Sequence, residues 1–130
     1  MPFELRVAPG ESLARIRAWG REDFASTTEA LQKLGMDPRL LPKMSVLMDV
    51  RELEYLATPP EVATFASRAG QGLFAGHRIA ILVRRGAQFG IAKSFAEKSE
   101  RAGARTEVFA EESLALEWVR QSGDPPEEQR

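Results

Sequence analysis

The stretch of residues 45–61 reads SVLMDVRELEYLATPPE, an apolar run with one acidic residue in it, followed by a Thr-Pro-Pro-Glu step. Its nearly continuous apolar run, 46–50, is typical of a strand that is covered on both faces. Its end, Thr58-Pro59-Pro60-Glu61, has threonine at the N-cap position, proline at the first helical position and glutamate at the third. This combination predicts the start of a helix. A covered strand that leads into a helix indicates a sheet with helices packed on it.

Predicted strands and helices also alternate along the chain on either side of this stretch. Strands of alternating apolar and polar residues at 3–7 and 14–18 flank Pro9-Gly10, which predicts an antiparallel hairpin whose arginines point to the solvent-exposed face. Further strands are predicted at 46–50, 79–83 and 106–109, and helices at 24–34, 62–73, 91–102 and 112–119. The order β-β-α-β-α-β-α-β-α predicts an α/β fold, with a mixed, mostly parallel sheet packed by helices.

Short polar and glycine signals mark the helix ends. Asp23 is placed to cap the first helix at its N-terminus. Gly35 and Gly103 follow the first and third helices, where a residue in the left-handed conformation commonly ends a helix.

Composition limits the kind of protein. The chain has 130 residues, with 18 basic and 19 acidic side chains, so its charge offers no general attraction for nucleic acid. It has no cysteine, which excludes disulfides, thiolate metal sites and cysteine nucleophiles. The N-terminus lacks the apolar core of a signal peptide, and no apolar run is long enough to span a membrane. We expect one cytoplasmic domain, 1–121, followed by a polar, disordered tail at 122–130.

Several sequence features occur together in one known family. They are Trp19-Gly20 before the acidic-capped helix, the strands 46–51 and 78–83, Phe89-Gly90, and the ending Val108-Phe109 with Glu112, Ala115 and Trp118. In this order and spacing, over about residues 3–120, they resemble the SpoIIAA-like fold of STAS domains and of small stand-alone bacterial STAS/SEC14-type proteins. The resemblance implies a SpoIIAA-like fold and a module that binds proteins or small ligands without catalysis.

A first candidate site lies at the carboxyl edge of the parallel strands, the usual ligand position in such sheets. Arg51 follows one covered strand, and Arg84 and Arg85 follow the next, close to Gln88. Guanidinium groups beside two helix N-termini would suit a phosphate, a carboxylate or a lipid headgroup. The alternative is that these are exposed arginines flanking helices, with no ligand.

Thr58 is a second candidate, with two interpretations. As a helix cap it accounts for every residue type from 58 to 61. The resemblance implies a different role, because anti-sigma-factor antagonists are phosphorylated on a serine at the start of this helix. This chain departs from that pattern with Thr58, Pro59 and Pro60, which puts the regulatory phosphosite in doubt.

Leu53, Tyr55 and Leu56 form a third candidate, an apolar bend that would serve as a surface for a partner protein or a homodimer. Packing of these residues under the second helix is the equal alternative.

Asp49 does not fit a receiver-type phosphorylation site, because Ala8-Pro9-Gly10 and Ala110 stand where further acidic residues and a lysine are needed. We expect its carboxylate to bond nearby backbone amides instead.

No catalytic constellation, cofactor motif or metal-ligand set is evident. His77 is the only histidine, and without a second histidine or a cysteine it predicts no metal site. The leading hypothesis is therefore a non-enzymatic STAS-like binding or regulatory module that acts through protein–protein contacts. The alternative is a protein that binds or carries a lipid or an anionic small molecule at the carboxyl edge of the sheet.

Overall fold

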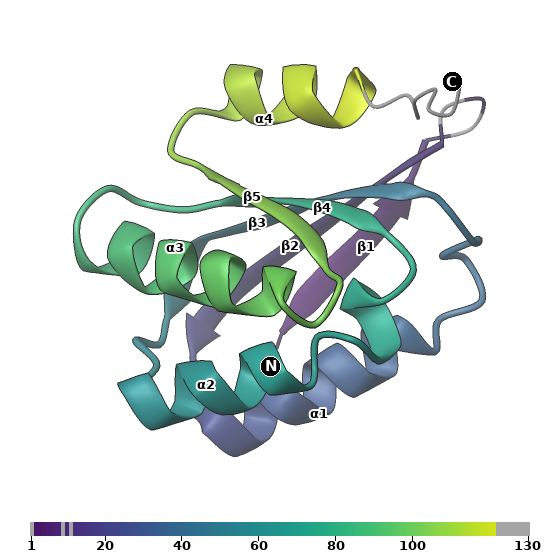
Figure 1. The fold of residues 1–130 in the computed structure, drawn as a ribbon. Coiled ribbons are helices and arrows are strands. Elements are labelled where there is room, and N and C mark those ends of the chain that lie inside the picture. The colour runs from purple at the N-terminus through teal and green to yellow at the C-terminus, as the bar shows by residue number, and fades with distance from the viewer. Residues whose placement is uncertain (1, 9, 11, 122–130) are drawn as a thin grey trace.

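A five-stranded sheet with four α-helices forms the protein (Figure 1). The computed structural model describes residues 2–8, 10 and 12–121, so the predicted tail at 122–130 lies outside the described residues. The elements are β1 (Phe3–Val7), β2 (Leu13–Arg21), α1 (Phe24–Gly35), β3 (Ser45–Glu54), α2 (Pro59–Ser67), the short 3-10 helix η1 (Gly72–Phe74), β4 (Arg78–Leu82), α3 (Ala87–Glu100), β5 (Arg105–Phe109) and α4 (Glu112–Arg120). The predicted order of strands and helices is confirmed.

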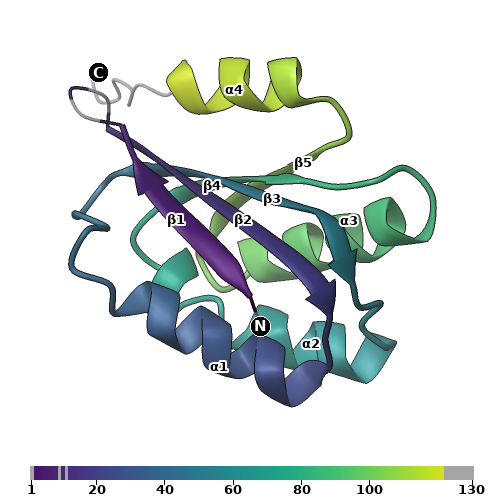
Figure 2. The ribbon, with the colours of Figure 1, turned by 180° about the vertical axis from the view of Figure 1, so that it is seen from behind.

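The strands lie in the sheet in chain order, β1-β2-β3-β4-β5. β1 is antiparallel to β2, and all later pairs are parallel. Because each parallel strand is added beside the previous one, crossovers of one hand place all the connecting helices on the same face. The helices α1, α2 and α3 accordingly cover one face, and α4 alone lies on the other, which we call the α4 face (Figures 1 and 2).

The larger apolar core lies between the sheet and the helices α1–α3, around fully buried side chains such as Ile16, Val46 and Ile79. A smaller cluster lies under α4, where Ala115 and Val119 pack on Leu47, Ala80 and Leu82. α4 packs on β3, β4 and β5. The part of the α4 face formed by β1 and β2 therefore carries the exposed arginines of the hairpin, as the sequence predicted.

β3 is longer than the predicted strand 46–50 and reaches Glu54. Its extension pairs with the carboxyl end of β2, after a bulge at which Arg17 faces Asp49 but Trp19 faces Glu52. The charged residues of this extension concealed it, because a strand read from apolar residues ends where they stop. The pairing with β2, which no local pattern reports, continues the strand.

The first helix does not end in the predicted way. Asp23 caps it as expected, accepting a hydrogen bond from the Ser26 amide at 2.9 Å. Gly35, however, is not in the left-handed region, and Met36 with a φ of −104° is the C-cap. A Cβ at Gly35 would lie 2.8 Å from the Leu73 nitrogen, so close packing against η1 explains this glycine. Gly103, with a φ of 93°, has the predicted conformation.

None of the helices formed by the described residues is both long and apolar enough to cross a membrane.

Candidate functional site

The carboxyl end of β3 extends beyond its neighbour β4. Their pairing stops where Asp49 faces Leu82, while β3 continues to Glu54. The carbonyl groups of this extension on the β4 side have no strand to bond. Their hydrogen-bond partners must come from side chains or solvent, because unpaired backbone groups are costly once buried.

Gln88, in the first turn of α3, supplies a hydrogen-bond donor to one carbonyl of this extension. Its Nε2 donates to the Val50 carbonyl at 2.7 Å, and its Oε1 accepts the Arg84 backbone amide at 2.6 Å. The residue is only 7% exposed. Gln88 therefore links the ends of β3 and β4 inside the fold.

Arg84 completes the same edge. Its guanidinium donates to the Arg51 carbonyl and, at 3.3 Å, to the Leu53 carbonyl. Two of the predicted ligand-binding residues, Arg84 and Gln88, are thus brought together, and both have hydrogen-bond partners on β3. Their role toward an anion stays a prediction.

The other two predicted residues lie apart from this pair. Arg85 bonds Glu111 at 2.9 Å, and its side chain is 73% exposed. Arg51 points to the α4 face, where it binds Asp49 at 2.8 Å and Glu112 of α4 at 3.4 Å. The predicted cluster of three guanidinium groups is therefore divided between the strand edge and the α4 face.

Asp49 is held by several groups at once. Its carboxylate accepts the Arg51 amide at 3.1 Å, as the sequence predicted, and both nitrogens of the Arg51 fork, Nε and Nη2, at 3.0 and 2.8 Å. Burial raises the pKa of Asp49, but these hydrogen bonds and the charges of Arg51 and Arg17 outweigh burial, so the pKa lies below its ordinary value. The carboxylate therefore stays ionised well into the acid range.

This lowered pKa predicts acid sensitivity. A carboxyl group whose pKa is lower in the folded state stabilises the fold above its unfolded pKa, and loses this contribution as pH falls through the folded pKa. We expect Asp49→Asn to melt at a lower temperature than wild type at neutral pH, with the gap closing below about pH 4. Thermal melts by circular dichroism across this range test it, and a gap of constant size would contradict it.

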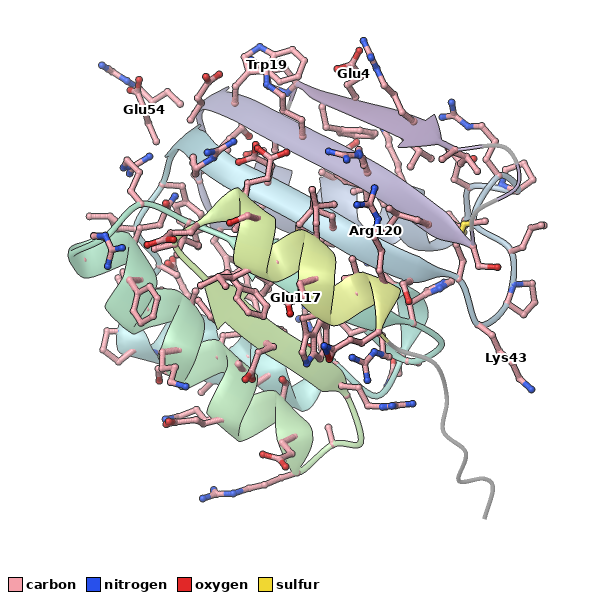
Figure 3. The ribbon with its side chains drawn as sticks, turned by 90° about the horizontal axis from the view of Figure 1, so that it is seen from above. Glu4, Trp19, Lys43, Glu54, Glu117 and Arg120 are labelled. Atoms are coloured by element: carbon pink, nitrogen blue, oxygen red, sulfur yellow. The ribbon has the colours of Figure 1, made fainter. Side chains whose placement is uncertain are left out.

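The uncovered part of the α4 face contains a groove of about 300 Å³ beside α4. Figure 3 views this face from above, with Glu4 and Trp19 on the strands that α4 leaves uncovered. The lining residues are Glu4, Arg6, Arg15, Ile16, Arg17, Leu47, Asp49 and Glu112. Three arginines and three carboxylates make its formal charge zero.

Two arginines of this groove form ion pairs with residues of other elements. Arg15 binds Glu112 of α4 at 3.3 Å, and Arg17 binds Glu52 of β3 at 2.6 Å. The Arg17 guanidinium also lies 4.6 Å from the centre of the Trp19 ring. The groove thus offers guanidinium donors and carboxylate acceptors on the sheet, and the ring of Trp19 lies next to it through its contact with Arg17.

Sequence reasoning found the exposed arginines of this groove but did not identify them as a site. Their alternation along β2 predicted only that they face solvent. The groove exists because α4 covers β3–β5 and not β1–β2, and no sequence signal reports how far a helix reaches across a sheet.

Thr58 lies at the helix start that the sequence predicted. Its hydroxyl accepts the Glu61 amide at 3.4 Å, and Glu61 Oε1 accepts the Thr58 amide at 3.0 Å, which makes a complete capping box. The Tyr55 hydroxyl donates to the same Glu61 oxygen at 2.9 Å. Thr58 is exposed to solvent. The cap is confirmed, and the phosphosite stays a prediction.

Comparison with known proteins identifies the fold. No family model matches the sequence, and no curated protein is significantly similar to it. The structure is similar to a solved one, an uncharacterised protein of the DUF3478 family with a SpoIIAA-like fold from Shewanella loihica PV-4. Its TM-score is 0.55 at 15% identity, over 91% of this chain and 92% of that chain. The chain has a SpoIIAA-like fold. At 15% identity, this similarity supports the fold of the protein and says nothing about its activity.

The three predicted partner-surface residues of this SpoIIAA-like protein differ in exposure. Leu53 is 6% exposed and Tyr55 is half-buried, whereas Leu56 is 52% exposed. A contact at this bend would therefore use Leu56 and the edge of Tyr55. The partner surface stays a prediction.

Tyr55 has an unusual environment for an ionisable group. Burial, and after it the hydrogen bond to Glu61 and the negative charges of Glu61 and Asp23, raise the pKa of Tyr55. A phenol whose pKa is higher in the folded state stabilises the fold below its unfolded pKa, and this contribution is lost as pH rises above about 10.

Because Tyr55 is the only tyrosine, this prediction has a direct measurement. Ultraviolet absorbance should show no tyrosinate in the folded protein above about pH 10, where a free phenol is half ionised. Tyrosinate should then form together with the loss of helical circular dichroism. Ionisation at the ordinary pH while the protein is still folded would contradict the prediction.

Within the described residues, no group of three or more histidine, cysteine, aspartate or glutamate side chains is arranged to hold a metal ion. His77 Nδ1 lies 2.8 Å from the Met44 carbonyl, which gives this ring a structural contact before β4.

Proposed function

We propose that this SpoIIAA-like protein is a non-enzymatic binding module that acts through protein–protein contacts. One observation carries the proposal: α4 leaves the β1–β2 part of its face uncovered, with a groove of arginines and carboxylates next to Trp19. Arginine and tryptophan are enriched at the centres of protein interfaces. A groove with equal numbers of positive and negative groups complements a mixed-charge protein surface better than it does an isolated anion.

Affinity capture from the source lysate with quantitative mass spectrometry tests this function. Arg17→Glu and Trp19→Ala alter the groove and its neighbouring ring. The matched control is Glu97→Lys, which changes an exposed residue of α3 on the opposite side of the sheet. A partner should be enriched by wild type and by the control, and reduced by about tenfold with the groove variants. Equal capture by all variants, or no enrichment above an unrelated bait, would reject the groove as the contact surface.

Regulation by phosphorylation at Thr58 is a proposal that follows the family resemblance. Phosphate there would lie at a helix N-terminus, where negative charge is favourable. Thr58→Asn tests it cleanly, because asparagine keeps a capping side chain but has no hydroxyl to modify. Labelled ATP in the source lysate should label wild type and not the variant. Equal labelling, or none, would sink the idea.

Binding of an anionic small molecule or lipid headgroup at the carboxyl edge is the second candidate function. It is favoured by the α3 N-terminus, which has no side-chain cap at Gly86 and lies beside the exposed Arg85. Native mass spectrometry before and after organic extraction should reveal a bound anion that Arg85→Ala releases. Arg84→Ala is a weaker test, because Arg84 also supports β3. Identical masses before and after extraction would argue against a carrier.

A further inference from the structure

The free edge of β1 exposes a short row of backbone hydrogen-bonding groups. At the two ends of the hairpin, Trp19 N–H donates to the Pro2 carbonyl at 3.3 Å and Ala8 N–H donates to the Leu13 carbonyl at 3.2 Å. Bonded and non-bonded residue pairs alternate in an antiparallel ladder, so the even-numbered residues of β1 bond β2. The N–H and C=O groups of Phe3, Leu5 and Val7 therefore point away from β2.

Little in the described part of the chain occupies this row. β1 is the outermost strand of the sheet, with no element beyond it in Figures 2 and 3. Within the described residues, the side-chain hydrogen bond given to this row comes from Arg39, whose Nη1 reaches the Leu5 carbonyl at 3.4 Å. Arg39 is anchored to Asp37, and its side chain is 58% exposed. A long hydrogen bond from an exposed side chain does little to prevent another strand from pairing with this edge.

The residues of β1 are complementary to a second copy of themselves. In an antiparallel pair with a two-fold axis at Leu5, Phe3 faces Val7 of the second copy and Leu5 faces Leu5. These are the residues with outward N–H and C=O groups, so each pair would exchange two hydrogen bonds. Phe3 and Val7 are only partly buried in one chain, and both lie on the apolar face of β1.

The charged face of β1 matches in the same register. Glu4 of one copy faces Arg6 of the other, on both sides of the axis. In the single chain Arg6 is directly opposite Arg15, a like charge, and binds Glu4 of its own strand at 3.0 Å. Opposite charges directly across a ladder are stabilising and like charges destabilising. The sequence of β1 thus favours self-pairing over a random partner strand.

We infer that β1 is the dimer interface of this protein, at which a second copy of the chain pairs antiparallel about an axis at Leu5 and joins two sheets into one. An isologous two-fold contact of this kind needs only one self-complementary patch. The inference does not depend on the proposed groove partner, since it rests on the backbone edge and register of β1, although Glu4 and Arg6 also line the groove.

Charge variants test this register. Glu4→Arg alone places four positive groups at the axis, and Arg6→Glu alone places four negative ones, so each should raise the dimer dissociation constant about tenfold. An equimolar mixture of the two variants should form a heterodimer, because every facing pair is again opposite in charge. Sedimentation velocity over a concentration series measures all three samples, with circular dichroism to confirm folding.

Amide exchange of the wild-type protein gives a second, variant-free test. In the dimer, the amides of Phe3, Leu5 and Val7 should be protected, whereas on dilution they should exchange quickly while Glu4 and Arg6 stay protected by β2. A protein that is monomeric at every concentration would overturn the inference. So would a dimer whose mass is unchanged by Glu4→Arg and Arg6→Glu, or whose odd-numbered β1 amides stay unprotected. Loss of partner capture with an intact dimer would instead concern the groove.

Discussion

Gln88→Met should lower the free energy of unfolding by about 2–4 kcal/mol, although it keeps the size and shape of the side chain. The substitution leaves the Val50 carbonyl and the Arg84 amide without the partners that Gln88 provides at 2.7 and 2.6 Å. An unsatisfied buried group costs about 1–3 kcal/mol, and both of these hydrogen bonds are partly buried. The apolar replacement cannot recover this, because neither backbone group is removed with it.

Urea unfolding followed by circular dichroism measures the change. Gln32→Ala, which removes an exposed glutamine from α1, is the control and should change stability by less than about 0.5 kcal/mol. Gln88→Met should also speed amide exchange at Arg84, since that amide loses its acceptor. If Gln88→Met were as stable as Gln32→Ala, solvent would be able to replace the hydrogen bonds of Gln88, and α3 would not stabilise the end of β3.

Gly35→Ala should destabilise the protein by about 1–3 kcal/mol, the usual cost of overpacking. The added Cβ would lie 2.8 Å from the Leu73 nitrogen and 3.3 Å from both Gly72 carbons, all of them backbone atoms that cannot rotate away. The junction of α1 with η1 must therefore separate. Leu73, which is 2% exposed, would lose packing as this happens.

The same substitution at Gly90 is the matched control, with the opposite sign. Gly90 lies within α3, and a Cβ there would meet nothing within 4 Å. Alanine favours a helix interior over glycine, so Gly90→Ala should stabilise the protein by about 0.5–1 kcal/mol. Thermal and urea unfolding of both variants decide the matter. A stable Gly35→Ala protein would mean that η1 is free to move away from α1.

Most of the architecture was predictable from sequence because its signals are local. The apolar run at 46–50, the capping box from Thr58 to Glu61 and the cap at Asp23 each depend on residues within one turn or strand. The order of these elements then leaves few arrangements for a parallel sheet. The SpoIIAA-like fold expected from the resemblance is confirmed by the structural comparison.

The candidate sites were less predictable, because they depend on pairs of residues distant in the chain. The carboxyl-edge prediction placed Arg51, Arg84, Arg85 and Gln88 at one end of the sheet, and sequence could not show that Gln88 and Arg84 bond the carbonyls of β3. Leu53 looked like part of an exposed bend and is buried, because β3 continues along β2. Whether an anion binds there stays a prediction.

Elements, their order, their N-terminal caps and the solvent-facing side of the hairpin could all be read from the sequence alone, since periodicity and capping act between neighbours in the chain. Three other features depend on the packed fold: the length of β3, the side chains that complete its edge, and the part of the sheet that α4 leaves uncovered. Each arises where segments far apart in sequence meet. Backbone groups there take whichever donors and acceptors the fold brings to them, and no local pattern encodes that choice.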